Sequence, residues 1–536
     1  MNSKILKKTA QKAFLLLVLC AFKVHSQDAV QEENPQADVP KQKQVLTVTA
    51  PVHFYNLNPH TASYNSEAQI LSGLFEGLFS YDPVTLEPQY AIAVSYKISR
   101  DSKRWTFTLR EDALFSDGTP VTAESVKKSW LKLLRTPGAP YASLFDIIKG
   151  ASDFRTGNGS EENVAIYDLD EHTLSIHLTT PASHLPRLLC MASFAVTGTE
   201  ENVYSGPFVL SEINENQAVL EKNEHYYDKE NTKLDRITFR FCDDADENAF
   251  AFNTGLSDWV SGAVNLSRTI SKDAVHVTAE FATEYMFFKM RGNIWSNAEF
   301  RQALLEAAPW DSLRENTFVQ ASTLVYPIGN YPSVRGYSYT DGEEASSLMK
   351  IARRNAGIPD GEILEIVMAV TESEYMQKKA ALLKEAWEKL GVSLRTVEIP
   401  SDKYLHSIPD VDADIFSYTW IGDFADPLAF LELFRGNSTL NVTNWSNPDF
   451  DALLNEAALY TNEKHNSLLG QAEQLLLDEA VILPVQHPVS LNVIDLNAVG
   501  GWAPNSFDIH PLKYLFKKET KPDVPNVVML CQGSAD

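Results

Sequence analysis

The nucleophiles, acids and histidines of this chain show no local arrangement that is typical of catalysis. A covalent hydrolase needs a nucleophile beside a base, and a glycosidase needs two paired acids. The sequence contains no Gly-x-Ser-x-Gly, no His-Glu-x-x-His and no Cys-x-x-Cys motif, and its 12 histidines are scattered. We therefore expect no enzyme, no cofactor and no metal site. An exported hydrolase remains a remote alternative, because the members of a catalytic triad need not be close in sequence.

Acidic side chains dominate the charge of the molecule. Asp and Glu number 71 against 46 Lys and Arg, which gives a formal net charge of −25. Nucleic acids and anionic membrane surfaces would be repelled by this charge, so we expect neither as a partner. The two acidic runs, residues 243–247 and 410–414, are typical of solvated faces, although either could bind a cation weakly.

The first 26 residues have the composition of a secretory signal. A lysine-rich start precedes the apolar run 13–22, which as a helix would be about 15 Å long and too short for a bilayer core of about 30 Å. We expect cleavage after Ser26 and export to the periplasm. A lipid anchor at Cys20 is the alternative, but Leu19 stands where a lipidation signal normally has a small residue.

The two ends of the exported chain have few features of folded structure. Residues 27–43 have almost no large apolar groups and predict a flexible linker, and residues 519–536 predict a loose tail. After cleavage three cysteines would remain, namely Cys190, Cys242 and Cys531. An odd number leaves one thiol over, and the sequence does not tell which two would pair.

Strands and helices alternate between these ends. Residues 45–49 and 105–110 have the pattern of strands, and Thr122 is placed to cap a helix over 123–134. A helix over 376–390 stops at Gly391 and leads into a strand at 392–395. A helix over 468–480 leads into a strand at 481–484 in the same way. This alternation predicts an α/β fold.

A series of motifs resembles a known family. The motifs are LFEGL (74–78), YD (81–82), LEP (86–88), AIA (91–93), LREDA (109–113), FSDGTPVTA (115–123), SW (129–130), YSGPF (204–208), FRQAL (300–304) and WIGDFADP (420–427). Their order and spacing resemble the oligopeptide- and dipeptide-binding family of solute-binding proteins of ABC importers. The resemblance covers residues 44–516, nearly the whole mature chain.

This resemblance implies a periplasmic-binding-protein-like clamshell of two α/β lobes with an additional third domain. Lobe I would comprise residues 44–82, 204–293 and 494–518, the extra domain residues 83–203, and lobe II residues 294–493. Such lobes close on a ligand as rigid bodies about hinge strands. The implied function is that of a monomer that captures oligopeptides in the cleft and delivers them to a membrane ABC-type permease.

The resemblance also implies a ligand site around residue 420. In peptide-binding relatives the acid aligned with Asp423 takes the free α-amino group of the ligand, and the residue aligned with Trp420 lines the cleft, with Gly422 and Phe424 beside them. A cationic amine in a dry cleft needs a carboxylate to offset its lost hydration. Asp423 could instead cap a helix that begins near residues 427–428, a role for which Asp426 is better placed.

Three further residues are placed near the cleft by the same resemblance: Glu76, Gly77 and Tyr141. In that region an extended peptide would pair its backbone as an added strand, although Glu76 could equally be structural. The sequence departs from the peptide-binding pattern at Ser417, where relatives carry an arginine that meets the carboxyl end of the ligand. The length preference is therefore open, and a non-peptide ligand (a metal chelate, haem, a sugar or a modified peptide) is an alternative. A separate alternative is an interaction or adhesion role on the same scaffold.

Overall fold

The computed structural model describes residues 43–519 apart from 329, 423, 425 and 461. The described residues belong to a single compact unit. The predicted signal, almost all of the linker, Cys20, Cys531, the tail from residue 520 and the predicted ligand residue Asp423 lie outside the described residues. Within the described part, Cys190 and Cys242 are free thiols, and no helix there is both long and apolar enough to cross a bilayer.

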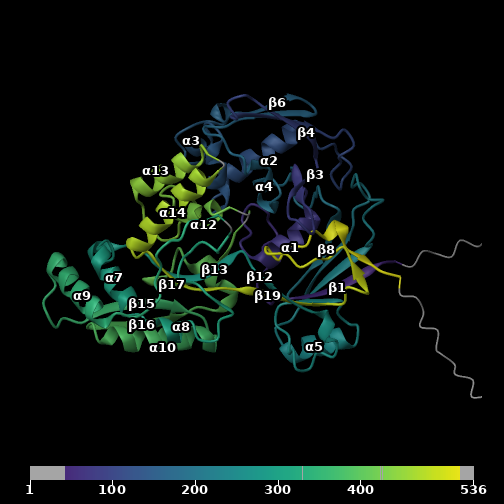
Figure 1. Cartoon of the computed structure of the whole chain (residues 1–536). Coiled ribbons are helices and arrows are strands. Elements are labelled where there is room, and N and C mark those ends of the chain that lie inside the picture. Colours follow the sequence, from purple (N-terminus) through teal and green to yellow (C-terminus); the bar gives the residue numbers. More distant parts are fainter. Residues whose placement is uncertain (1–42, 329, 423, 425, 461, 520–536) are drawn as a thin grey trace, which may run out of the picture. The chain divides into compact units, whose positions relative to one another are not determined.

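The first sheet has seven strands that come from three separate stretches of chain. Their order is β12-β19-β11-β1-β10-β9-β8, with β1 parallel to both β10 and β11. The strand β1, purple in Figure 1, lies near the start of the chain, yet it belongs to the same sheet as β8–β12 from the middle and β19 from near the end. The bounds are β1 Val45–Ala50, β8 Phe208–Ile213, β9 Gln217–Lys222, β10 Arg236–Phe241, β11 Trp259–Ser261, β12 Val275–Ala279 and β19 Val489–Ile494.

The second sheet has six strands in the order β14-β18-β13-β17-β15-β16. Every residue of β13 is buried, as expected for a strand in the middle of a covered sheet. Helix α10 (Glu374–Glu388) packs on β15 and β16. The strand bounds are β13 Ala282–Phe288, β14 Val319–Gln320, β15 Leu364–Val370, β16 Val392–Glu398, β17 Ile415–Ile421 and β18 Ile482–His487.

The helix-to-strand units predicted from the sequence are confirmed. Ser373 caps α10 by accepting a hydrogen bond from the Met376 amide, and Leu383 and Trp387 are fully buried. The chain then turns at Gly391, whose φ of 71° is in the left-handed region that favours glycine. Strand β16 follows and pairs in parallel with β15. Helix α14 (Glu463–Asp478) leads into β18 in the same manner.

A four-stranded antiparallel sheet is formed by the chain between β1 and β8. Its order is β4-β5-β7-β6, and helix α2 (Ala123–Arg135) packs against β6 and β7. The predicted cap is confirmed, because the Thr122 hydroxyl accepts a hydrogen bond from the Ser125 amide at 3.3 Å. The bounds are β4 Ala93–Ile98, β5 Arg104–Leu109, β6 Ile166–Asp170 and β7 Thr173–His177.

Shorter elements connect these sheets. Two small antiparallel pairs are β2 Phe79–Tyr81 with β3 Pro88–Tyr90, and β20 Val499–Gly500 with β21 Phe516–Lys517. The other helices are α1 Asn65–Leu74, α3 Ala151–Arg155, α4 Leu185–Leu188, α5 Ala245–Asn253, α6 Gly292–Trp295, α7 Ala298–Glu306, α8 Trp310–Leu313, α9 Gly342–Ala356, α11 Tyr404–Ser407, α12 Leu428–Leu431 and α13 Pro448–Ala457.

The chain passes between the seven-stranded and six-stranded sheets at two adjacent places. One is the step from β12 to β13 at Glu280, and the other is the step from β18 to β19 at Pro488. The Glu280 amide donates a hydrogen bond to the Pro488 carbonyl at 3.1 Å, which ties the two steps together. The predicted boundaries placed β13 in lobe I together with β1, and most of β19 in lobe II together with β15–β18. In the structure β13 pairs in the six-stranded sheet with β17 and β18, and β19 pairs in the seven-stranded sheet that contains β1. The domain boundaries themselves remain a prediction.

Candidate functional site

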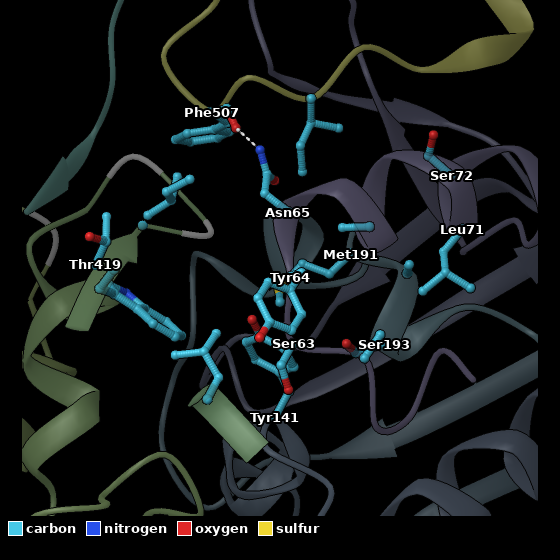
Figure 2. Close-up of a pocket in the computed structure, with 18 of the residues that line it drawn as sticks. Ser63, Tyr64, Asn65, Leu71, Ser72, Tyr141, Met191, Ser193, Thr419 and Phe507 are labelled. Atoms are coloured by element: carbon cyan, nitrogen blue, oxygen red, sulfur yellow. Dashed lines mark hydrogen bonds between the residues drawn. The ribbon is translucent and has the colours of Figure 1, made fainter. Parts of the chain in front are cut away.

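A cavity of about 540 Å³ lies among elements that belong to different sheets. Its wall comes from α1 and the segment that follows it, from residues 190–195, from the start of α10, from β17 and from residues 507–511. Figure 2 shows some of the residues that line the cavity, with Tyr64 and Tyr141 near the middle of the view and Thr419 of β17 to one side. The volume is within the range of sites for small ligands.

The start of α1 is held in place by a buried carboxylate. Glu67 is fully buried and accepts hydrogen bonds from three backbone amides, those of Asn56 at 2.7 Å, Ser63 at 2.8 Å and Tyr64 at 3.0 Å. A carboxylate at the third position of a helix stabilises the helix start by satisfying amides that have no intrahelical partner. This arrangement fixes Ser63 and Tyr64 where they line the cavity.

The opposite side of the cavity is formed by β17. All of residues 417–422 line it. Trp420 is 4% exposed, and its indole nitrogen donates a hydrogen bond to the Ala429 carbonyl at 2.8 Å. Its ring lies 6.1 Å from the ring of Tyr141 and 6.2 Å from that of Tyr418. The structure thus brings together the two aromatic residues that the sequence predicted for the site, Trp420 and Tyr141.

Glu76 also lines the cavity, but its carboxylate already has protein partners. One oxygen accepts a hydrogen bond from the Lys513 ammonium group at 2.9 Å, and the other accepts one from the Tyr226 hydroxyl. Burial alone would lower the pKa of Lys513, but the adjacent Glu76 carboxylate raises it overall. Burial, and secondly Glu76, raise the pKa of Tyr226. The carboxylate therefore lies within a buried polar network.

The two predicted glycines line the cavity at points of close packing. A Cβ atom on Gly77 would lie 2.4 Å from the Leu189 carbonyl oxygen and 2.9 Å from that of Phe79. A Cβ atom on Gly422 would lie 2.5 Å from the ring of Phe281. Both positions therefore need glycine for steric reasons, and both bring backbone to the cavity wall.

The remaining predicted residues lie just beyond β17. Phe424 is buried and stacks on His184, with ring centroids 5.2 Å apart, and it is not among the residues that line this cavity. Asp426 accepts a hydrogen bond from the Leu428 amide at 2.9 Å at the start of α12, as its predicted capping role requires. Its carboxylate also lies 3.1 Å from the His465 ring nitrogen.

The position that departs from the peptide-binding pattern is part of the wall. Ser417 is 8% exposed, and its amide donates a hydrogen bond to the Tyr404 hydroxyl at 2.9 Å. The charged side chains in the described wall are two carboxylates, Glu76 and Glu284. In the described ranges 43–328, 330–422, 426–460 and 462–519, together with Phe424, no three His, Cys, Asp or Glu side chains are grouped as metal ligands would be.

A sequence profile described as bacterial extracellular solute-binding proteins, family 5, middle part, matches residues 87–441. The chain belongs to this family. It is 26% identical over 511 residues to the oligopeptide-binding protein OppA of Bacillus subtilis, which covers 89% of this chain and 93% of that protein. Family 5 solute-binding proteins, the class predicted from the sequence, are binding proteins for transport and not enzymes.

Solved structures of similar proteins share the fold. The Escherichia coli murein tripeptide-binding protein MppA superposes with a TM-score of 0.79 at 24% identity, covering 89% of this chain and 99% of that one. Listeria monocytogenes OppA bound to peptide gives a TM-score of 0.76 at 23% identity, covering 89% and 100%. The two-lobed α/β fold predicted for this family 5 protein is confirmed.

Several wall residues were not found by sequence reasoning. They are spread over the chain and include Tyr64, Met191, Glu284, Tyr375 and Phe507. Of these, only Glu284 could have been suspected from the sequence, because it is an acid within the largely apolar stretch Ala282–Phe288. An acid in a buried strand needs hydrogen-bond or charged partners.

Proposed function

We propose that this family 5 protein binds oligopeptides in the cavity and delivers them to an ABC-type permease. The observation that carries the proposal is the edge of β17. The strand pairs with β13 over Ile415–Ile421, but with β15 only at Ile415 among the described residues. Beyond that point its second edge borders the cavity, where an extended peptide could add as a further strand.

Strand geometry determines which backbone groups of β17 point away from β13, toward that second edge. The Ser417 amide is directed away from β13, since it donates to Tyr404. Backbone groups of a strand alternate in direction, so those of Thr419 point to the same side. The Ser417 amide is already used by Tyr404, so the Ser417 carbonyl and the backbone groups of Thr419 would bind the peptide main chain, whatever the peptide sequence. The aromatic rings of Trp420 and Tyr141 would then cover the peptide side chains.

We assign the amino end of the ligand to Asp423, whose position lies outside the described residues. A free α-amino group buried in the cleft needs a nearby carboxylate. Asp423→Ala is expected to weaken peptides with a free amino group by about 2–5 kcal/mol. Amino-acetylated peptides of the same sequence are the control and should change little. An equal loss for both would remove the assignment.

The remaining predicted residues have supporting roles in this proposal. Gly77 and Gly422 keep backbone at the wall of the cavity, and Glu76 fixes the segment after α1 through Lys513. Phe424 packs on His184, close in sequence to the wall residues of β17.

The central experiment is identification of the ligand. Native mass spectrometry of the protein purified from its own cells should show a bound peptide, and calorimetry with that peptide should show saturation at one ligand per chain. Incubation should leave the peptide intact. Steady consumption of the peptide would favour the hydrolase alternative, and a co-purified sugar, haem or metal chelate would favour the non-peptide alternative.

We also propose that the protein works as a periplasmic monomer after removal of residues 1–26. The composition of that segment supports export. The mass of the mature protein tests this directly, since cleavage after Ser26 leaves Gln27 as the first residue. A diacylglycerol adduct on Cys20 would show the lipid-anchored alternative, and light scattering would report the oligomeric state.

A further inference from the structure

Glu284 has an unusual environment for a residue that lines a ligand cavity. It lies in the middle of β13, is 6% exposed, and accepts hydrogen bonds from three side chains. The Lys379 ammonium group lies 3.0 Å from Oε1, the Tyr375 hydroxyl 2.7 Å from Oε2, and the Gln486 amide nitrogen 2.5 Å from Oε2. One ammonium group, one hydroxyl and one amide thus converge on a single carboxylate.

The three donors are positioned by regular secondary structure. Tyr375 and Lys379 are four residues apart on α10 and so share one face of the helix. Gln486 is the cross-strand neighbour of Glu284 on β18. Further hydrogen bonds join the donors to one another, from Lys379 and from Gln486 to the Tyr375 hydroxyl. The donor group is therefore built into the wall.

Such a donor group has the chemistry of a carboxylate-binding site. Hydrogen bonds in which both donor and acceptor are charged are among the strongest in proteins. Burial, and secondly the Glu284 carboxylate, raise the pKa of Tyr375, so its hydroxyl keeps the proton that it donates. Tyr375 and Glu284 both line the cavity, so this donor group lies at the cavity surface, with the protein's own carboxylate in it.

We propose that Glu284 is an internal substitute for a ligand carboxylate and makes the cavity select ligands whose carboxyl end is neutral. This inference rests on the proposed peptide-binding function. Lys379 is already paired with Glu284, and Lys513 with Glu76, so neither ammonium group needs a second carboxylate. A free peptide carboxylate in this cavity would lose its hydration and also approach two acids.

The four residues between 43 and 519 that the structure does not describe add no basic side chain. They are Gly329, Asp423, Ala425 and Thr461, none of which is basic. Ligands with a free amine and a carboxamide, ester or lactam at the other end therefore match the cavity better than ordinary peptide acids.

The first test removes the internal carboxylate. Glu284→Ala leaves Lys379, Tyr375 and Gln486 around an empty space, so acetate should refill it. We expect acetate at millimolar concentration to raise the melting temperature of Glu284→Ala, whereas acetamide should not. Neither should affect the wild type or Glu284→Gln, in which the side-chain amide still fills the space. No difference between acetate and acetamide with Glu284→Ala would overturn the carboxylate-binding role of the three donors.

The second test measures ligand preference with pools of tri-, tetra- and pentapeptides of alanine, as free acids and as carboxamides. The wild type should bind the carboxamides at least about tenfold more tightly. Glu284→Gln and Glu284→Ala should both lose or reverse this preference, because Lys379 is then available to a ligand carboxylate. An unchanged ratio in both variants would overturn the proposal. Should the wild type bind neither pool, the peptide-binding function itself would fail, while the acetate result would still report on the donor group.

Discussion

The carboxylate of Glu76 lies 2.9 Å from the ammonium group of Lys513, which is 437 positions later in the chain. Both side chains are almost completely buried. The segment after α1 is therefore tied to the C-terminal part of the described chain by an ion pair whose acid, Glu76, lines the cavity. Burying two charges is costly, so such a pair is stable only while both partners and their hydrogen bonds are present.

Breaking this pair should destabilise the fold strongly. Lys513→Met leaves Glu76 buried without its counter-ion, and we expect the free energy of unfolding to fall by about 3–5 kcal/mol. Urea denaturation followed by circular dichroism measures this. Lys378→Met is the matched control, because the Lys378–Glu315 pair is exposed and should contribute little. Glu76→Gln combined with Lys513→Met should recover part of the loss. A midpoint for Lys513→Met equal to that of the wild type would contradict the argument.

Gly77→Ala should disturb both stability and binding. Its new Cβ atom would meet two backbone carbonyl oxygens, at 2.4 and 2.9 Å, and backbone cannot move aside as a side chain can. We expect a loss of about 1–3 kcal/mol in the free energy of unfolding and weaker ligand binding by calorimetry. Gly342→Ala, at the first residue of α9, is the control. Apart from its two chain neighbours and nearby backbone of its own helix, no atom lies within 4 Å of the position that the new methyl group would take. It should leave stability unchanged or slightly increased. Equal stability of the two variants would contradict this argument, because it would mean that the backbone around Gly77 can move to accept a methyl group without cost.

The elements that sequence reasoning predicted are those whose signals are local. The cap at Thr122, the cap at Asp426 and the turn at Gly391 each depend on residues a few positions apart. Helix α10 was predicted from the spacing of its apolar residues alone. Short-range hydrogen bonds and periodic burial determine such features, so they can be read without the tertiary structure.

The site was only partly predictable because its wall is assembled from distant segments. Trp420 and Tyr141 came from resemblance to a family, and their contact across 279 positions could not be inferred from spacing. The partners of Glu284 were equally hidden, since Lys379 and Gln486 look like ordinary surface residues in the sequence. Only the acid within an apolar strand indicated that a buried network had to exist.

Trp420 should report ligand binding by its fluorescence. Its ring forms part of the cavity wall, so a bound peptide would change its surroundings. Trp420→Phe should abolish most of the ligand-induced change in emission. It should also cost about 1–3 kcal/mol of stability, because the buried Ala429 carbonyl loses its donor. Trp445→Phe is the control, since Trp445 is buried against Phe450 and is not part of the wall. A ligand-induced change in emission as large in Trp420→Phe as in the wild type would mean that the ligand binds away from Trp420.

Glu280, at the step between the two large sheets, should make stability depend on pH. Burial, and secondly the Asp508 carboxylate, raise the pKa of Glu280 from 4.5 to about 8. The folded protein therefore keeps a proton that the unfolded chain releases near pH 4.5. The resulting stability is fully present below about pH 4.5 and is lost as the pH rises to about 8, by on the order of 5 kcal/mol.

Glu280→Gln removes this titration while keeping the size of the side chain. Urea denaturation at a series of pH values should therefore show a smaller fall in the free energy of unfolding for the variant than for the wild type between about pH 5 and pH 8. The two proteins should differ most near pH 8, where the variant is the more stable. Other buried acids, such as Glu473, whose pKa is raised to about 7 chiefly by burial, contribute equally to both curves. Parallel curves over this range would mean that Glu280 is ionised in the folded protein and has a counter-charge at the step between the sheets.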